Sequence, residues 1–393
     1  MSQDRVLLLE GARTPVGSFG GALKDVPGFE LGATAAKAAL ERAGVEAGAI
    51  GEVVMGCIGQ VGPDAYNARR VALEAGLPVT TPAYTVNRLC GSGLQAIWSA
   101  AMQLRWGGVD IALAGGDEAM SRMPFYDFGA RAGYKLGDRT LMDGTVMMLT
   151  DPFHNIHMGV TAENVAAKYG VSRQEQDAFA LESQTRAASV AAKVAFSEEI
   201  TPVEVGGRRP VTVTEDEHPK PGTTLEALAK LRPAFQKDGT VTAGNASGIN
   251  DGAAAVVLAR ESVAAERGLT GLVSLEAVAT AALEPGLMGY APVPALQKLF
   301  AQTGIAPSDV DVFEVNEAFA AQAVAVVRDA GLDPEKTNPY GGAIALGHPV
   351  GATGAILTLR AAKHLARTDG ELAVVTMCIG GGQALAALLR RVG

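Results

Sequence analysis

A repeated order of helix, glycine turn and strand constrains the fold of this 393-residue chain more than any other feature. Residues 31–55 read as a helix that ends near Gly44, a short polar turn, and a strand at 52–55. Residues 293–315 show the same order around Gly304, and the two glycines are 304 − 44 = 260 positions apart. A small unit of this kind cannot bury its apolar face alone, so a second copy predicts two units that pack together.

Two further matches follow in the same order along the chain. Residues 90–93, Cys-Gly-Ser-Gly, open a helix in the first half, and residues 347–351 open one in the second. The strand segment that begins at Asp110 parallels the one at Glu371, with an offset of 371 − 110 = 261. Because a nearly constant offset links these matches, we predict a duplicated α/β domain. The alternative, that two unrelated α/β units share a general pattern, is less favoured.

Apolar runs alternate with Ala-rich helical segments along the chain, which is typical of layered α/β domains. The expected strands are 6–9, 52–55, 111–114, 254–259, 310–315 and 372–377. The expected helices are 31–43, 94–104, 293–303, 318–329 and 353–366, and the stretch 160–193 is also strongly helical. We expect an N-terminal domain of residues 1–270, with an insertion of about 121–248 that carries substrate contacts, and a C-terminal domain of residues 271–393.

The composition argues against several functional classes. The net charge is −9, the sequence pI is about 5.2 and no basic stripe is present, so nucleic-acid binding is not expected. Three cysteines are too few for a disulfide framework and favour a reducing compartment. The N-terminal segment reads as a first strand and not as a signal peptide, and no apolar stretch approaches the length of a membrane span. We therefore expect a cytoplasmic protein without a membrane partner.

Cys90 is the first candidate for chemistry. A strand-like run ends at this residue, and Gly91 and Gly93 lead into a helix, so the sulfur is expected at a helix N-terminus. There the helix dipole and the free N–H groups lower the pKa of a thiol and can stabilise an oxyanion. The alternative is a buried structural cysteine, but the glycine-rich context favours a nucleophile.

Two more side chains lie at glycine-rich turns in the second half. His348 precedes a predicted helix and, by the repeat, occupies a place equivalent to the Cys90 segment, so it can serve as the base for a thiolate. The alternative is a capping or core histidine. Cys378 ends the last predicted strand before three glycines, a setting suited to proton transfer and, through backbone N–H groups, to oxyanion binding. A redox pair with Cys90 is the rival interpretation, although no Cys-x-x-Cys motif supports it.

The remaining polar positions allow two interpretations each. Asn316 lies at a strand end before a helix, where an N-cap and a site role are equally plausible. His154 and His157 have a spacing that a metal site can use, but no third ligand lies nearby, so no metal is expected. The polar turn 245–252 is either a plain loop or a ligand contact, and Cys57 reads as structural. Neither a P-loop nor a dinucleotide-binding motif is present.

Six motifs, in order along the whole chain, resemble those of the thiolase family. They are residues 87–96, 157–164, 245–251, 316–320, 347–349 and 378–382. Within that family the chain is similar to the bacterial acetyl-CoA acetyltransferase and β-ketothiolase group. The resemblance implies a five-layer αβαβα core of two duplicated halves with an inserted loop domain, usually assembled as a homotetramer.

The same resemblance implies a role for each motif residue. It implies that Cys90 is acylated, that His348 activates it, and that Cys378 takes a proton from the second acyl-CoA. Asn316 would hold a water that forms one oxyanion hole with His348, and the backbone N–H groups of Cys90 and Gly380 would form the other. The positions that match contacts to CoA or substrate are Ser247, His157, Met158, Ala318 and Phe319.

The expected activity is that of an acetyl-CoA C-acetyltransferase, a reversible Claisen condensation through a cysteine acyl-enzyme. Coenzyme A is then substrate and product, and no permanently bound cofactor is expected. A degradative 3-ketoacyl-CoA thiolase differs only in chain length and direction. A cysteine hydrolase would give Cys378 no task, and a non-catalytic acyl-CoA or lipid carrier would not need the full set of catalytic side chains.

Overall fold

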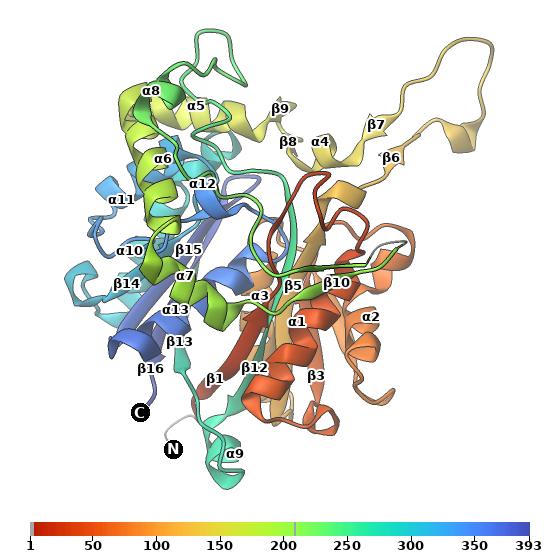
Figure 1. The fold of residues 1–393 in the computed structure, drawn as a ribbon, viewed down its shortest axis with the longest axis vertical. Helices are drawn as coiled ribbons and strands as arrows, with labels where there is room; N and C mark the ends of the chain where they lie inside the picture. The colour runs from red at the N-terminus through yellow and green to blue at the C-terminus, as the bar shows by residue number, and fades with distance from the viewer. Residues whose placement is uncertain (1–3, 208–209) are drawn as a thin grey trace.

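The computed structural model describes residues 4–207 and 210–393 and is built around one mixed ten-stranded sheet (Figure 1). Its strands are β1 (Val6–Arg13), β2 (Gly17–Ser18), β3 (Glu52–Gly56), β4 (Ala83–Val86), β5 (Ile111–Ala119), β12 (Asn250–Arg260), β13 (Val273–Ala282), β14 (Val312–Val315), β15 (Leu372–Ile379) and β16 (Gln383–Arg391). They lie in the order β14-β15-β16-β13-β1-β12-β5-β3-β4, and β2 pairs with β12.

The two halves of this sheet repeat one pairing scheme. In the first half β3 runs parallel to β5, which pairs antiparallel with β12, which pairs antiparallel with β1. In the second half β14, β15, β16 and β13 repeat these steps. Even a register shift recurs, between Leu8 and Glu10 in β1 and between Leu275 and Ala277 in β13. The halves join where β1 pairs with β13, and the predicted duplication is therefore confirmed.

Helices cover both halves of the sheet and also fill the space between them. They are α1 (Gly28–Ala43), α2 (Asn67–Glu74), α3 (Ser92–Trp106), α4 (Gly144–Met148), α5 (Met158–Tyr169), α6 (Arg173–Ala187), α7 (Val190–Glu199), α8 (Leu225–Ala229), α9 (Glu261–Glu266), α10 (Pro292–Thr303), α11 (Ala320–Asp329), α12 (Ala343–Leu346) and α13 (Thr353–Thr368). Within the described ranges, every helix is too short or too polar to span a bilayer.

Three apolar cores define the layers. The central core combines side chains of α3 and α13 with the inner faces of both halves of the sheet, from Val256 in β12 to Val375 in β15. A second core lies under α1 and α2, and a third lies under α10 and α11 (Figure 1). The sequence of layers is therefore helix, sheet, helix, sheet, helix, as predicted. Gly93 and Gly354 let α3 and α13 meet, because a Cβ at Gly354 would lie 2.4 Å from the backbone nitrogen of Leu94.

The insertion splits into a helical part and an extended arm. The helical stretch predicted at 160–193 forms α5, α6 and the start of α7, because Gly170 adopts a left-handed φ of 66° and Ser172 begins α6 with a capping box. The short strands β6 (Phe125–Tyr126) and β7 (Met142–Asp143) lead out into a loop that extends away from the layers (Figure 1). The insertion also contains α8 and two more antiparallel pairs of short strands, β8 (Thr150–Asp151) with β9 (Ile156–His157) and β10 (Val203–Val205) with β11 (Val211–Val213).

All six predicted strands and all five individually predicted helices are present, most of them extended by a few residues. The sequence prediction missed β13 and β16, two antiparallel neighbours in the second half. Both are rich in alanine, a residue with low intrinsic strand propensity, so only their place between other strands makes them extended. The domain limits of 1–270 and 271–393 stay a prediction.

Candidate active site

Two parallel strands bring the first pair of predicted residues to one edge of the sheet. β14 and β15 run side by side, with Val315 paired to Thr376. Asn316 directly follows β14 and donates its backbone N–H to the carbonyl of Thr376 at 3.0 Å, while Cys378 lies two residues further along β15. Because the carboxyl ends of parallel strands meet at the same edge, Asn316 and Cys378 lie close together.

Cys90 sits in a tight turn just before α3. The strand was predicted to end at Cys90, but β4 ends four residues earlier, at Val86. Leu89 has a φ of 48°, a left-handed conformation that costs energy for a residue with a bulky side chain and must be held by its surroundings. The Ser92 hydroxyl holds this turn, because it accepts from the N–H of Arg88 at 2.9 Å and donates to the carbonyl of Leu89 at 2.6 Å.

The environment of the Cys90 sulfur corrects one expectation from the sequence. The backbone N–H groups of Gly380 and of Cys90 itself hydrogen-bond to the sulfur and lower its pKa, as a helix N-terminus was expected to do. Removal of water by the packed protein atoms outweighs them and raises the pKa of Cys90 to about 11. The resting thiol is therefore neutral, and its proton must leave when it attacks a substrate.

The same geometry places the two predicted reactive sulfurs together. Gly380, whose N–H contacts the Cys90 sulfur, is two residues beyond Cys378. Burial raises the pKa of Cys378, and the nearby charge of a Cys90 thiolate raises it further. Cys378 is 1% exposed and packs against Ala318 and Phe319. A Cys378 thiolate is thus a strong base whenever it forms.

His348 is held so that one ring nitrogen stays free to accept a proton. The Thr353 hydroxyl donates to the carbonyl of Pro349 at 2.9 Å and lies 2.6 Å from the Nδ1 of His348. Because that hydroxyl hydrogen is already used, Nδ1 carries the ring hydrogen and Nε2 is unprotonated. Burial lowers the pKa of His348 to about 4, which keeps the imidazole neutral at physiological pH. Its backbone N–H donates to the Oδ1 of Asn250 at 2.9 Å.

The free nitrogen of His348 faces Asn316. The Nδ2 of Asn316 lies 3.4 Å from the Nε2 of His348, and both residues are buried. Among residues 4–207 and 210–393, no group hydrogen-bonds to the buried Oδ1 of Asn316. An acceptor of this kind fits a water molecule. A water held there would lie next to Nε2, and the two groups together suit the binding of an enolate oxyanion.

The predicted CoA contacts gather around an aromatic cluster. The ring of His157 stacks on Phe235 with centroids 4.8 Å apart, and Phe319 meets Phe235 edge to face at 6.0 Å. Ser247 joins the same region, because its backbone N–H donates to the carbonyl of Ala318 at 3.0 Å. Met158 begins α5, and its sulfur would lie 3.9 Å from a Cβ placed at Gly380, so it connects this cluster to the sulfurs.

Four residues of this site received no role from the sequence: Phe235, Asn250, Glu317 and Thr353. Asn250, Glu317 and Thr353 lie in or beside glycine-rich or polar motifs that pointed to the site, and the Gly-Ala-Thr-Gly run after His348 was the available signal for Thr353. Phe235 follows an unremarkable polar stretch and left no signal. Its role depends only on where the insertion folds back against His157.

His154 is separate from the aromatic cluster. Its Nδ1 lies 2.8 Å from Asp151, and its Nε2 lies 3.3 Å from Glu284. In the described part of the chain no three His, Cys, Asp or Glu side chains are grouped to hold a metal ion. Cys57 is buried, with its sulfur 3.7 Å from Glu118, and lies at the end of β3 in the other half.

Comparison with known proteins agrees with this geometry along nearly the whole chain. The family descriptions "Thiolase, N-terminal domain" and "Thiolase, C-terminal domain" match residues 6–262 and 269–391. The chain is 50% identical over 390 residues to Beta-ketothiolase BktB of Cupriavidus necator, an alignment that covers 98% of this chain and 99% of that protein. It is 46% identical over 392 residues to a probable acetyl-CoA acyltransferase of Staphylococcus aureus, with 98% and 99% covered.

Solved structures show the same likeness. The Bacillus anthracis acetyl-CoA acetyltransferase superimposes with a TM-score of 0.97 at 41% identity, covering 99% of both chains. Human mitochondrial 3-ketoacyl-CoA thiolase gives 0.96 at 42%, with all of both chains covered. Its complex with CoA gives 0.95 at 43%, covering 99% of this chain and 98% of that one. The chain belongs to the thiolase family, whose members are acyltransferases.

Proposed function

We propose that this enzyme catalyses the reversible transfer of an acyl group from acyl-CoA to the α-carbon of acetyl-CoA. One observation carries the proposal. The N–H of Gly380, two residues beyond Cys378, contacts the sulfur of the neutral Cys90 thiol, and Asn316, which pairs with buried His348, lies at the same strand edge as Cys378. The relatives named as β-ketothiolase and acetyl-CoA acetyltransferase support the substrate class. The human thiolase crystallised with CoA supports CoA esters as the ligands.

In the first step the Cys90 sulfur attacks the thioester carbonyl of an acyl-CoA. Nε2 of neutral His348 takes the thiol proton and passes it to the departing CoA sulfur, so the products are the acyl-enzyme and free CoA. The N–H groups of Cys90 and Gly380 stabilise the oxyanion of the tetrahedral intermediate. A thiol with a pKa of about 11 needs this coupled proton transfer, because the free thiolate is scarce at neutral pH.

In the second step Cys378 gives its thiol proton to Nε2 of His348 and, as the thiolate, removes an α-proton from acetyl-CoA. The enolate oxygen is held by Nε2 of His348, which then carries a proton, and by a water bound at Asn316. The enolate carbon attacks the acyl-enzyme carbonyl, the new C–C bond forms, and Cys90 leaves as a thiolate that takes the proton from Nε2 of His348, so both thiols and the neutral imidazole are restored. The net charge of the site is unchanged over one cycle, and thiolysis is the reverse path.

The proposal is tested by mixing the enzyme with acetoacetyl-CoA and CoA and following the loss of the 3-ketoacyl absorbance. Cys90→Ser is expected to abolish the acyl-enzyme, which mass spectrometry of the intact protein detects after mixing with acetyl-CoA. Hydrolysis of simple esters without CoA would instead identify a cysteine hydrolase. Tight CoA binding without turnover would identify a carrier.

The chain-length preference is a separate question. The match to human mitochondrial 3-ketoacyl-CoA thiolase keeps a degradative role on longer substrates as the second candidate. A series of 3-ketoacyl-CoA substrates of increasing length separates the two. A kcat/KM that peaks at four carbons supports the acetyltransferase, and one that rises with chain length supports the degradative enzyme.

We also propose a homotetramer in the cytoplasm. The arm beyond β6 and β7 exposes Phe128 and Leu136, large apolar side chains whose exposure a partner subunit would remove. All three cysteines are free, as a reducing compartment favours. Light scattering coupled to gel filtration measures the mass of the assembly, and a mass equal to one or two chains contradicts the tetramer.

A further inference from the structure

A buried carboxylate directly follows Asn316. Glu317 is 1% exposed, and three donors converge on its two oxygens. The hydroxyl of Ser183 lies at 2.7 Å, the Nδ2 of Asn338 at 2.8 Å and the backbone N–H of Ile344 at 3.2 Å. Burial raises the pKa of Glu317 and these three hydrogen bonds lower it, and three donors on one buried side chain make this a firm junction.

The three donors come from three separate parts of the chain. Ser183 lies on α6 of the insertion, whereas Ile344 lies on α12, which ends two residues before His348. One carboxylate therefore links the strand end that carries Asn316 to the segment that carries His348. The third donor, Asn338, lies between them and is itself fixed to β14.

Asn338 acts as a short extension of the sheet beside β14. Its backbone N–H donates to the carbonyl of Phe313 at 2.8 Å, and its side chain bonds both the N–H and the carbonyl of Val315, at 2.8 and 2.9 Å. It adopts a left-handed φ of 49°, which asparagine tolerates better than most residues. The remaining N–H of its amide donates to Glu317, and the Ser183 hydroxyl also accepts from the backbone N–H of Gly342 at 3.1 Å.

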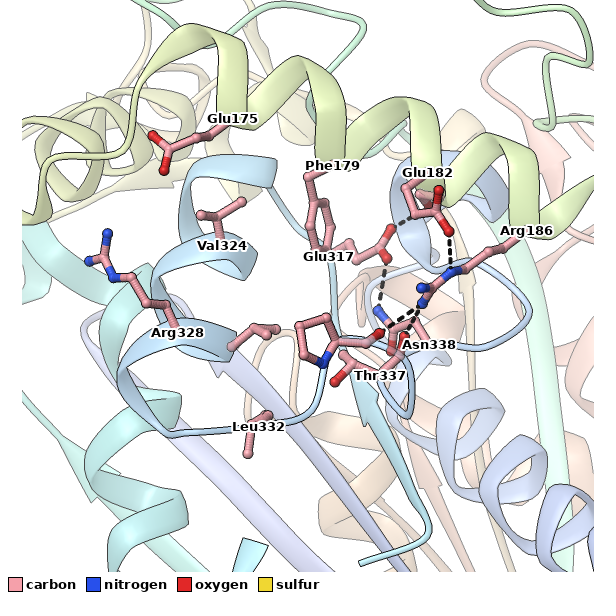
Figure 2. Close-up of a pocket in the computed structure, with 13 residues that line it drawn as sticks. Glu175, Phe179, Glu182, Arg186, Glu317, Val324, Arg328, Leu332, Thr337 and Asn338 are labelled. Atoms are coloured by element: carbon pink, nitrogen blue, oxygen red, sulfur yellow. Dashed lines mark hydrogen bonds and ion pairs between the residues drawn. The ribbon is translucent and has the colours of Figure 1, made fainter. Parts of the chain in front are cut away.

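The carboxylate has a close contact on one side and open space on the other. A Cβ at Gly342 would lie 2.2 Å from the Cδ of Glu317, so the segment leading to His348 presses directly on this side chain. On the opposite side Glu317 lines a cavity of about 420 Å³ between α6 and α11 (Figure 2). Figure 2 shows Phe179 and Val324 on the walls of that cavity. Packing therefore restrains Glu317 on the Gly342 side, and the three hydrogen bonds restrain it on the side of the cavity.

We propose that Glu317 is a positioning residue that sets the spacing between Asn316 and His348. The inference rests on the proposed function, in which that pair holds the enolate. In Glu317→Gln one of the two acceptor oxygens becomes an NH₂ group, which then faces the N–H donors of Asn338 or Ile344. Two donors cannot share a hydrogen bond, so the strand end that carries Asn316 shifts. Thr353 and Asn250 still hold His348, and the distance of 3.4 Å between Asn316 and His348 changes.

The test compares the two half-reactions in Glu317→Gln. Acylation of Cys90 by acetyl-CoA, followed by mass spectrometry after rapid mixing, is expected to stay within about threefold of wild type, because the Gly380 hole is untouched and Asn250 and Thr353 keep His348 in place. Condensation and deuterium uptake at the α-carbon of acetyl-CoA are expected to fall about 10- to 100-fold, the range for a misplaced oxyanion site. The KM for CoA is expected to change less than twofold.

Glu182→Gln is the matched control. It makes the same chemical change on α6 beside the same cavity, but Glu182 is mostly exposed and its partner is Arg186. Both half-reactions should stay at wild-type rates in this variant. Glu317→Asp is a second variant that keeps the charge but withdraws the carboxylate by one methylene, and it should also slow condensation selectively.

Two results overturn the inference. One is an equal fall of acylation and condensation in Glu317→Gln or Glu317→Asp, which indicates general disruption. The other is wild-type condensation in either variant. Failure of the proposed function has a different signature, because the wild-type enzyme would then form no acyl-enzyme.

Discussion

The two central helices, α3 and α13, each begin with a hydroxyl side chain, but the two hydroxyls have different partners. Ser92 opens α3 and Thr353 opens α13, at an offset of 353 − 92 = 261 that matches the sequence repeat. The Ser92 hydroxyl bonds to backbone groups only and holds the turn of Cys90, whereas the Thr353 hydroxyl also contacts the Nδ1 of His348. Duplication thus supplied two equivalent positions, and in the proposed mechanism one fixes the nucleophile while the other orients the base.

The strand ends of the two halves differ more strongly. Cys378 near the end of β15 corresponds to Asp117 in β5, at an offset of 378 − 117 = 261, and Glu118 follows as a second buried acid. Burial raises the pKa of Asp117 to about 8 and that of Glu118 to about 7. At this strand position the first half therefore keeps acids where the second half keeps a thiol.

The largest expected effect sets Cys378→Ala against Asp117→Asn. Loss of the thiol removes the base for the α-proton, so condensation should fall about 100- to 10,000-fold while acylation of Cys90 persists. Asp117→Asn should leave both steps within about threefold of wild type, because the amide keeps an acceptor for Asn67. Rapid-mix mass spectrometry and steady-state thiolysis measure the two steps. Equal loss of both steps in Cys378→Ala contradicts the assigned roles.

Thr353→Val tests whether the hydroxyl at the start of α13 orients the ring of His348. Valine keeps the shape but leaves the Nδ1–H of His348 without its acceptor, so acylation should slow about 10- to 100-fold. Thr353→Ser restores the hydroxyl and should recover most of the rate. A Thr353→Val variant that acylates at the wild-type rate would show that the hydroxyl has no such task.

The pH dependence of acylation checks the state of the base. Because the pKa of His348 is lowered to about 4, its neutral form is already present well below physiological pH. We expect kcat/KM to stay nearly constant between pH 5.5 and 8, since no titration of the base falls there. An acid limb centred near 6.5 would show that His348 titrates like an exposed imidazole.

The smallest effect concerns stability and the acids of the first half. The folded-state pKa of Asp117, about 8, lies above its usual value, so the folded protein binds this proton more tightly than the unfolded chain does. This contribution to stability is complete below the unfolded pKa of about 4 and is lost as the pH rises towards 8. Asp117→Asn should therefore raise the Tm by about 2–4 °C at pH 8.5 and change it little at pH 4. Thermal melts at matched protein concentration measure the difference, and an increase that is larger at pH 4 reverses the expected sign.

Much of the fold could be predicted because its signals are local. Apolar runs, Ala-rich helical segments and glycines at helix ends identified the main strands and helices, and Gly44 and Gly304 both adopt the left-handed conformation that the turns require. The strands β13 and β16 carried no such signal, because alanine is extended there only between its neighbours. The insertion was recognised from its change of composition, but the path of its arm was not.

Some features of the site also follow from local sequence, and others depend on the tertiary structure. The sequence alone determined the duplicated halves and the order of the motifs, and it predicted Cys90, His348, Asn316 and Cys378 as site residues, since these depend on residue type and spacing. Tertiary structure decided that burial raises the pKa of Cys90 by more than the backbone N–H groups lower it. It also decided that Thr353 selects the tautomer of His348 and that Glu317 joins two distant segments. Desolvation and hydrogen-bond partners depend on which atoms lie within a few ångströms, and these come from parts of the chain that spacing along the sequence does not connect.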